Sequence, residues 1–138
     1  MNKKLFAFTI NTLDQAENII LESKIYKIKP ILHFKNYIIN GFGLEYILNF
    51  QNMLISKFGR TSFEFFVDCG FDNSLSISMA INKIKYIKLR GNSIVLSKIK
   101  NITNKNRVLL NPSFNIVDCR NKKNINSKIK KLYSEGKI

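Results

Sequence analysis

Asp68, Arg90 and His33 carry the side chains with which this sequence could hold an anion or transfer a proton. Carboxylate and imidazole groups serve as general acids and bases, and the planar guanidinium of arginine binds anions through paired hydrogen bonds. His33 is the single histidine of the chain. These three residues form the candidate catalytic set, with Asp68 at its centre and Arg90 as the partner of a bound anion.

The candidate residues lie at or near the ends of segments with the pattern of buried strands. These segments are rich in phenylalanine, isoleucine and valine, and polar residues, glycine or proline bound them. The predicted strands are residues 4–10, 31–34, 63–69, 85–89 and 108–110, with a further short extended piece at 114–117. Apolar residues at helical spacing predict helices over residues 12–24, 44–58, 74–83 and 93–103, whereas 36–42 fits neither pattern.

Strands that alternate with helices of about 10–15 residues predict βαβ units and a parallel sheet. The 138 residues suffice for one domain. They do not suffice for an eight-stranded barrel, which needs about 200 residues or more. We therefore expect an α/β fold. Its core is a single-domain open parallel sheet of about five strands with helices on both faces, flavodoxin-like, or else a piece of a barrel-like arrangement.

Residues 75–89 allow a second interpretation. LSISMAI, at 75–81, alternates apolar with small or polar residues, which is typical of a strand and would give an α+β fold with a 75–89 hairpin. Against this, Asn82–Lys83 is a poor two-residue turn, and Asp72 and the residues after it are good helix caps. We predict a helix here. A helix start is also predicted at Thr12, because Gln15 follows at capping-box spacing.

The carboxyl ends of parallel strands meet at one edge of a sheet, and ligands bind beyond that edge. This rule places His33, Asp68, Arg90 and Asn111 on a common rim. Polar residues at strand ends have a second explanation, since every strand must end in residues that turn the chain. The sequence also has neither a phosphate loop nor a dinucleotide fingerprint. We therefore favour a non-catalytic binding or scaffold domain over a small-molecule enzyme with its site at the strand ends.

The formal net charge of +14 makes a nucleic-acid-binding accessory protein a further alternative. A composition rich in lysine can produce the same charge without any functional reason. The chain has only four arginines, the residue preferred for phosphate contacts, which weakens the nucleic-acid interpretation. We expect residues 1–120 to form the α/β domain and 121–138 a basic C-terminal tail with a helix. The candidate nucleic-acid contacts in this tail are Lys122, Lys123, Lys128, Lys130 and Lys131.

The two cysteines occur in a repeated tripeptide, VDC, at 67–69 and 117–119. Thiolate, carboxylate and imidazole are zinc ligands, but neither cysteine has the C-x-x-C spacing of structural zinc sites, so no metal and no cofactor are predicted. Two cysteines are too few for a disulfide framework. No apolar stretch approaches the roughly 20 residues of a membrane helix. We expect a cytoplasmic protein whose partner, protein or RNA/DNA, is unknown.

The run FVDCGFDNSLSISMAINKIKYIKLRG, within residues 62–91, resembles the central part of a small family of uncharacterised alphaproteobacterial α/β proteins. In that family a strand ending in Asp-Cys-Gly is followed by an aspartate, a helix rich in leucine and alanine, and another strand. The resemblance extends weakly to LLNP near Asn111. It implies a helix at 74–83 and marks Asp68 and Cys69 as the strand end to examine, and it implies no activity.

Overall fold

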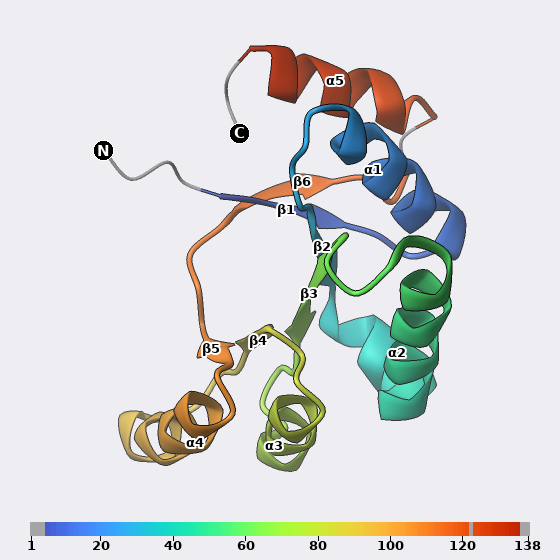
Figure 1. Ribbon diagram of the computed structural model, residues 1–138. Coiled ribbons are helices and arrows are strands. Elements are labelled where there is room, and N and C mark those ends of the chain that lie inside the picture. Colours follow the sequence, from blue (N-terminus) through green and yellow to red (C-terminus); the bar gives the residue numbers. More distant parts are fainter. Residues whose placement is uncertain (1–4, 122, 136–138) are drawn as a thin grey trace.

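Six parallel strands form one curved sheet in the part of the chain that the structure, a computed structural model, describes: residues 5–121 and 123–135 (Figure 1). The strands are β1 (Phe6–Thr9), β2 (Ile31–Phe34), β3 (Glu64–Asp68), β4 (Tyr86–Lys88), β5 (Leu109–Leu110) and β6 (Asn115–Asp118). Their order across the sheet is β5-β4-β3-β2-β1-β6. The predicted open parallel sheet is confirmed.

Helices connect successive strands from β1 to β5, a last helix follows β6, and together they cover the outer side of the sheet (Figure 1). They are α1 (Leu13–Ile25), α2 (Asn36–Phe58), α3 (Asn73–Ile81), α4 (Ser93–Lys105) and α5 (Ile125–Ser134). The predicted capping box is present, because Thr12 accepts from the Gln15 backbone and the Gln15 side chain accepts from the Thr12 backbone. α2 begins earlier than predicted and includes 36–42, with a break in helical geometry at Gly43, where φ is +83°.

The helices α1 to α5 all pack on one face, rather than on both as in the flavodoxin-like arrangement that we expected. Buried residues from each of them share one core with alternate strand residues such as Phe34, Phe65 and Val67. Ala7, Ile31 and Phe66 point to the opposite face. From β1 to β5 every crossover steps to the next strand in the same direction. Right-handed crossovers that never reverse direction place all their helices on one side.

Residues 75–89 form a helix and a parallel strand, so the 75–89 hairpin alternative is wrong. Asp72 caps α3 by accepting a hydrogen bond from the backbone N–H of Leu75 at 3.0 Å. Ser76, fully buried, donates its hydroxyl hydrogen to the carbonyl of Asn73 at 2.6 Å. Small residues at these positions let α3 pack close to the sheet, which explains why the segment has an alternating pattern without being a strand.

The extended piece predicted at 114–117 becomes β6, an edge strand that pairs with β1. No helix separates β5 from β6, and residues 111–114 cross from one edge of the sheet to the other over its helix-free face (Figure 1). Phe114 in this connection packs edge-on against Phe66, at 5.4 Å, and Tyr86, at 4.9 Å between ring centroids. Aromatic contacts of this kind hold the connection on the sheet.

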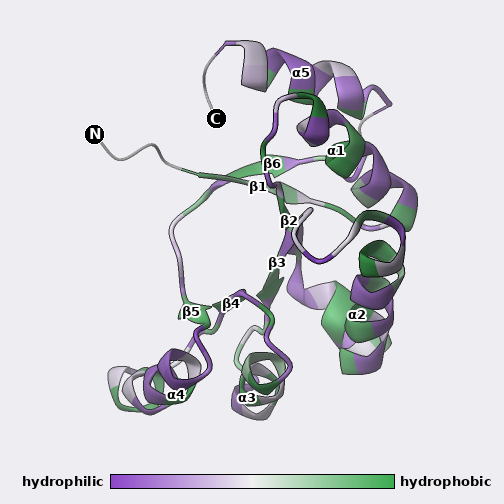
Figure 2. Ribbon diagram, viewed as in Figure 1, coloured by the Kyte–Doolittle hydropathy of each residue, from purple (hydrophilic) through white to green (hydrophobic). Residues whose placement is uncertain are grey.

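α5 packs against α1, and its apolar stripe is buried while its other faces are hydrophilic (Figure 2). Ile129 is fully buried, and Tyr133 forms a buried hydrogen bond of 2.6 Å with Ser23 of α1. The predicted C-terminal helix is therefore present over 125–134 and is docked on the domain. Burial raises the pKa of the Tyr133 hydroxyl, which stays protonated and available for this bond.

Replacing Tyr133 by phenylalanine should lower the free energy of unfolding by about 1–2 kcal/mol, because a buried hydroxyl of Ser23 loses its partner. Urea denaturation of Tyr133→Phe, Ser23→Ala and the double variant gives the coupling energy. The double variant should be nearly as stable as Tyr133→Phe alone. Strict additivity of the two single effects would contradict a direct bond.

Candidate functional site

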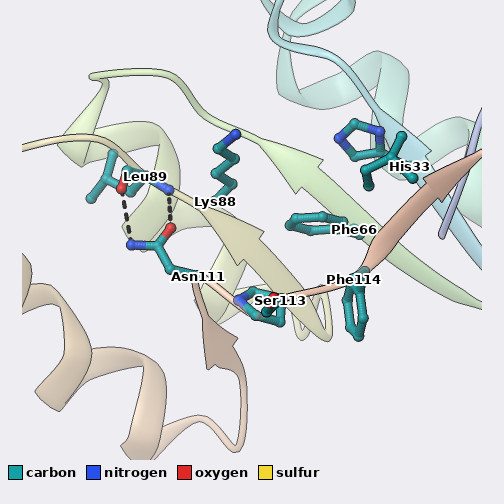
Figure 3. A pocket seen from close by; sticks show the side chains of 9 residues that line it. His33, Phe66, Lys88, Leu89, Asn111, Ser113 and Phe114 are labelled. Carbon is teal, nitrogen blue, oxygen red and sulfur yellow. Dashed lines mark hydrogen bonds between the residues drawn. The ribbon is translucent and has the colours of Figure 1, made fainter. Parts of the chain in front are cut away.

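A cavity of about 450 Å³ lies on the helix-free face of the sheet, toward the carboxyl ends of β2 to β4 (Figure 3). Alternate residues of the strands contribute its floor, and the β5–β6 connection contributes one wall. The lining residues are His33, Phe66, Lys88, Leu89, Asn111, Pro112, Ser113, Phe114 and Ile116. Predicted rim residues His33 and Asn111 are therefore part of one site, as the meeting of parallel strand ends requires.

His33 is held at the floor of this cavity by contacts on two sides. Its Nδ1 lies 2.8 Å from Oγ1 of buried Thr9, and its ring packs on Phe66 at 4.8 Å between centroids. The side chain is only 6% exposed. Burial is the largest influence on the imidazole and lowers its pKa from 6.5 to about 4. His33 is therefore uncharged at neutral pH.

Four charged groups also act on the His33 imidazole. Asp68 raises its pKa, whereas Lys88, Lys35 and Arg120 each lower it. Asp68 and Lys88 are register partners on β3 and β4, so their side chains point to the same face of the sheet as His33. The carboxyl edge thus gathers three cations, Lys35, Lys88 and Arg120, and two carboxylates, Asp68 and Asp118, near a neutral imidazole. The cations outnumber the carboxylates, which favours an anion.

Asp68 turns the chain at the end of β3 as well as facing the site. Its Oδ1 accepts a hydrogen bond of 2.9 Å from the backbone N–H of Gly70, and its backbone carbonyl accepts one of 3.0 Å from Asn36 Nδ2. The carboxylate is 9% exposed. Oδ1 of Asp68 therefore stabilises the turn. This is the structural role that the sequence offered as an alternative to a catalytic one.

The repeated VDC tripeptide has a structural explanation. Asp118 ends β6 as Asp68 ends β3, and its Oδ1 accepts a 3.0 Å bond from the backbone N–H two residues later, that of Arg120. In both copies the valine and the cysteine are buried in the core on the helix-covered face. The repeat therefore encodes two equivalent strand ends.

Arg120 is fixed above the carboxyl edge of β1 and β6. Its guanidinium donates two bonds to Asp118, at 2.9 and 2.7 Å, and one of 3.3 Å to the hydroxyl of Tyr37, which itself donates to Asn11. These bonds hold the pKa of the Asp118 carboxyl well below its usual value and raise that of Arg120. The arginine keeps its charge and its position near His33.

Arg90 does not join the cavity. Its backbone N–H donates to the carbonyl of Gly70 at 2.7 Å, and its guanidinium lies 6.0 Å from the ring centroid of exposed Phe71. The predicted set is thus divided: His33 and Asp68 share an environment, and Arg90 lies outside it. Lys88, the last residue of β4, occupies the place expected for Arg90, which lies beyond the end of the strand.

Asn111 lines the cavity, but its amide is engaged in the fold. Its Oδ1 accepts from the backbone N–H of Leu89 at 2.8 Å, and its Nδ2 donates to the carbonyl of Leu89 at 3.0 Å (Figure 3). The backbone of Asn111 is left-handed, with φ of +52°. Its side chain thus extends the β4–β5 ladder by one pair and supports the wall of the cavity.

Sequence reasoning missed Lys88, Arg120 and Phe114 as site residues. Lys88 was detectable, because period-2 alternation puts it on the same face as Tyr86 and Arg90. Arg120 and Phe114 were not, because both depend on the pairing of β6 with β1, a contact between segments more than 100 residues apart in the sequence. No local pattern records such a pairing.

Cys69 is buried, and burial raises the pKa of its thiol to about 12, with Asp68 and Asp72 adding to the shift. A protonated buried thiol is a poor nucleophile and a poor metal ligand. Among the described residues no group of three or more metal-ligating side chains converges. Within the same ranges, no helix is long and apolar enough to span a membrane.

Of the lysines predicted to contact nucleic acid, those that the structure describes do not line the cavity. Lys123 precedes α5, and Lys130 and Lys131 are exposed on it. Lys128 is half-buried on the same helix. Lys122 lies outside the described residues. Lys128, Lys130 and Lys131 thus belong to the helix that packs on α1, whereas Lys123 lines a separate hollow with residues at the start of α1.

The fold and the site define a singly wound α/β protein with barrel-type strand order and a polar cavity at the carboxyl ends of its strands. No family model and no curated protein matches the chain. Among solved structures it is similar to a protein from Coccidioides immitis assigned as a fructose-1,6-biphosphate aldolase, with a TM-score of 0.58 and 8% sequence identity. The match covers 78% of this chain and 44% of the other, so the chain spans less than half of that protein. This likeness is one of fold.

Proposed function

We propose that this protein binds a small anion of the phosphate or carboxylate class in the cavity at the carboxyl edge of the sheet. The observation that carries the proposal is that Lys88 lines the cavity beside His33, with Lys35 and Arg120 near enough to act on the imidazole, against the carboxylates of Asp68 and Asp118. The function is binding, in line with the non-catalytic domain favoured from the sequence.

The chemistry of the cavity supports an anion in particular. In the tautomer in which the Thr9 hydroxyl donates to Nδ1 of His33, the ring hydrogen lies on Nε2, from which it can donate to a ligand oxygen. Lys88 lines the same cavity and supplies a charge-assisted donor. Ser113 adds a hydroxyl on the opposite wall. Aromatic rings of Phe66 and Phe114 limit the access of water to these groups and so strengthen their electrostatic attraction.

His33 makes the proposal directly testable, because a chain with one histidine gives one set of imidazole resonances. We expect inorganic phosphate, pyrophosphate or citrate to shift the His33 ring signals in a saturable NMR titration at pH 7. Lys88→Gln should weaken this affinity about tenfold or more, because a hydrogen bond to a charged group contributes about 1.5–3 kcal/mol.

The matched control is Lys98→Gln, an exposed lysine on α4 whose loss changes the net charge equally. It should leave the titration unchanged. Equal weakening by both variants would mean that the anions respond to overall charge, and the absence of any saturable shift would refute the proposed site. Arg90→Gln, outside the cavity, should behave like the control.

A further inference from the structure

The opposite, amino-terminal edge of the sheet carries basic residues in each of the four turns that lead from a helix into β2, β3, β4 and β5. The turns are YKIKP (26–30), GRTSF (59–63), NKIK (82–85) and NRV (106–108). None contains an aspartate or a glutamate. The basic residues of this amino-terminal row are Lys27, Lys29, Arg60, Lys83, Lys85 and Arg107.

Three of the turns place the basic residue in an uncommon backbone conformation. Lys27, Lys83 and Arg107 have φ of +56°, +63° and +58°, in the left-handed region that favours glycine. In each case the backbone N–H of the next residue reaches back to a carbonyl of the last helical turn, as in Ile84 to Met79 at 3.1 Å. At each of these three positions the sequence has a basic residue, although glycine would adopt the same backbone conformation with less strain.

Contacts between neighbouring turns join several of these residues. Lys29 pairs with Glu64, the first residue of β3, at 2.7 Å. Lys83 Nζ lies 3.0 Å from Asn106 Oδ1, and Lys85 Nζ lies 3.4 Å from the carbonyl of Arg107. The last two turns and Glu64 also border a hollow of about 420 Å³, in which cations outnumber the one carboxylate. Lys27, Arg60, Lys83 and Arg107 are exposed.

The length of the row indicates the kind of partner. Neighbouring strands lie about 4.8 Å apart, so turns before four adjacent strands span about 15 Å. A small anion meets one or two cations, whereas a nucleic-acid strand presents a phosphate every few ångströms along its length. A bilayer surface is flat and contacts cations spread in two dimensions, while these cations follow a single line along the sheet edge.

We propose that the amino-terminal row is a nucleic-acid-binding surface that contacts the sugar-phosphate backbone. It lies at the end of the sheet opposite the anion cavity, and not on the C-terminal tail where sequence reasoning placed the contacts. Arg60 and Arg107 supply bidentate phosphate contacts, and the lysines supply point charges. Binding by such contacts is insensitive to base sequence and strongly sensitive to salt.

The left-handed backbone provides a variant that removes charge without harming the fold. Lys27→Gly, Lys83→Gly and Arg107→Gly combined should melt no lower than the wild type, because glycine is the preferred residue at these φ values. Fluorescence anisotropy with a labelled 20-nucleotide RNA and with a DNA duplex should show at least about tenfold weaker binding at 50 mM salt. The slope of log affinity against log salt should fall by about 2 for the single strand, at roughly 0.7 per lost phosphate contact.

The matched control removes the same charge elsewhere, by Lys123→Gln, Lys130→Gln and Lys131→Gln combined. It should retain nearly wild-type affinity. Equal loss of nucleic-acid affinity in both variants would overturn the proposal, as would tight nucleic-acid binding by the glycine variant. Binding to vesicles containing phosphatidylserine is measured in parallel, and a glycine variant that loses affinity only for these vesicles would also overturn it. The His33 titration with phosphate should be unchanged in the glycine variant, so this surface and the anion cavity are tested separately.

Discussion

Acidification from pH 7 to pH 4 should destabilise the protein by roughly 3 kcal/mol through His33 alone. The folded protein holds the pKa of this imidazole at about 4, whereas the unfolded chain has the ordinary value of 6.5. Each unit of difference corresponds to about 1.36 kcal/mol. Burial against Phe66 causes most of the shift, and Lys88, Lys35 and Arg120 add to it.

The sign follows from proton binding. Above pH 6.5 His33 is neutral in both states, and the free energy of unfolding does not depend on it. Between pH 6.5 and 4 the His33 imidazole binds a proton in the unfolded chain but stays neutral in the folded protein, so unfolding becomes progressively more favourable. Below pH 4 both states are protonated and the cost is constant.

Urea denaturation of the wild type and of His33→Gln at several pH values isolates this effect from the carboxylates, which titrate in both proteins. The difference in unfolding free energy between the two proteins should change by roughly 3 kcal/mol over pH 7 to 4. Parallel curves would contradict a buried neutral imidazole. Direct NMR titration of the His33 ring in the folded protein should give a midpoint near 4.

Gly70→Ala should lower the free energy of unfolding by roughly 2–4 kcal/mol and weaken the anion site. Gly70 has φ of +60°, where a side chain costs about 1–2 kcal/mol. A Cβ at this position would lie 2.9 Å from Asn36 Nδ2, the atom that donates to the carbonyl of Asp68. Displacing Asn36 loses that bond, which contributes about 1 kcal/mol or more.

Gly41→Ala is the matched control, because the same change there meets no atom within 4 Å and Gly41 lies inside α2. It should be neutral or stabilising by up to about 1 kcal/mol, the helix preference of alanine over glycine. Denaturant midpoints of the two variants, with phosphate titrations of the His33 signals, check both effects. A Gly70→Ala protein within about 0.5 kcal/mol of wild type would show that the β3–α3 turn tolerates a side chain.

Much of the secondary structure follows from local chemistry. Thr12 with Gln15 begins α1, Asp72 begins α3, and Pro30 precedes β2, and each acts through residues within one turn of itself. The parallel arrangement was predictable too, because a helix between two strands is the usual crossover that joins parallel neighbours in a sheet. The helical interpretation of 74–83 was correct for the same reason: its cap lies next to it in the sequence.

The site was predictable in part. His33, Asp68 and Asn111 were placed on the carboxyl edge by the rule that parallel strand ends meet there. Lys88 could also have been predicted, because alternate residues of a strand point to the same face of the sheet. Arg90 was placed with them, but it lies two residues beyond the end of β4 at Lys88, and its side chain lies over Phe71.

The amino-acid sequence by itself determined the strands, the helices, their caps and their parallel order, since these depend on residues a few positions apart. Tertiary structure alone decided that the helices share one face, that β6 crosses to pair with β1, and that Phe114 packs on Phe66. It also brought Arg120 near enough to lower the pKa of His33. The residues of these two pairs lie 48 and more than 80 positions apart, and burial of the core, which no local pattern records, brings them together.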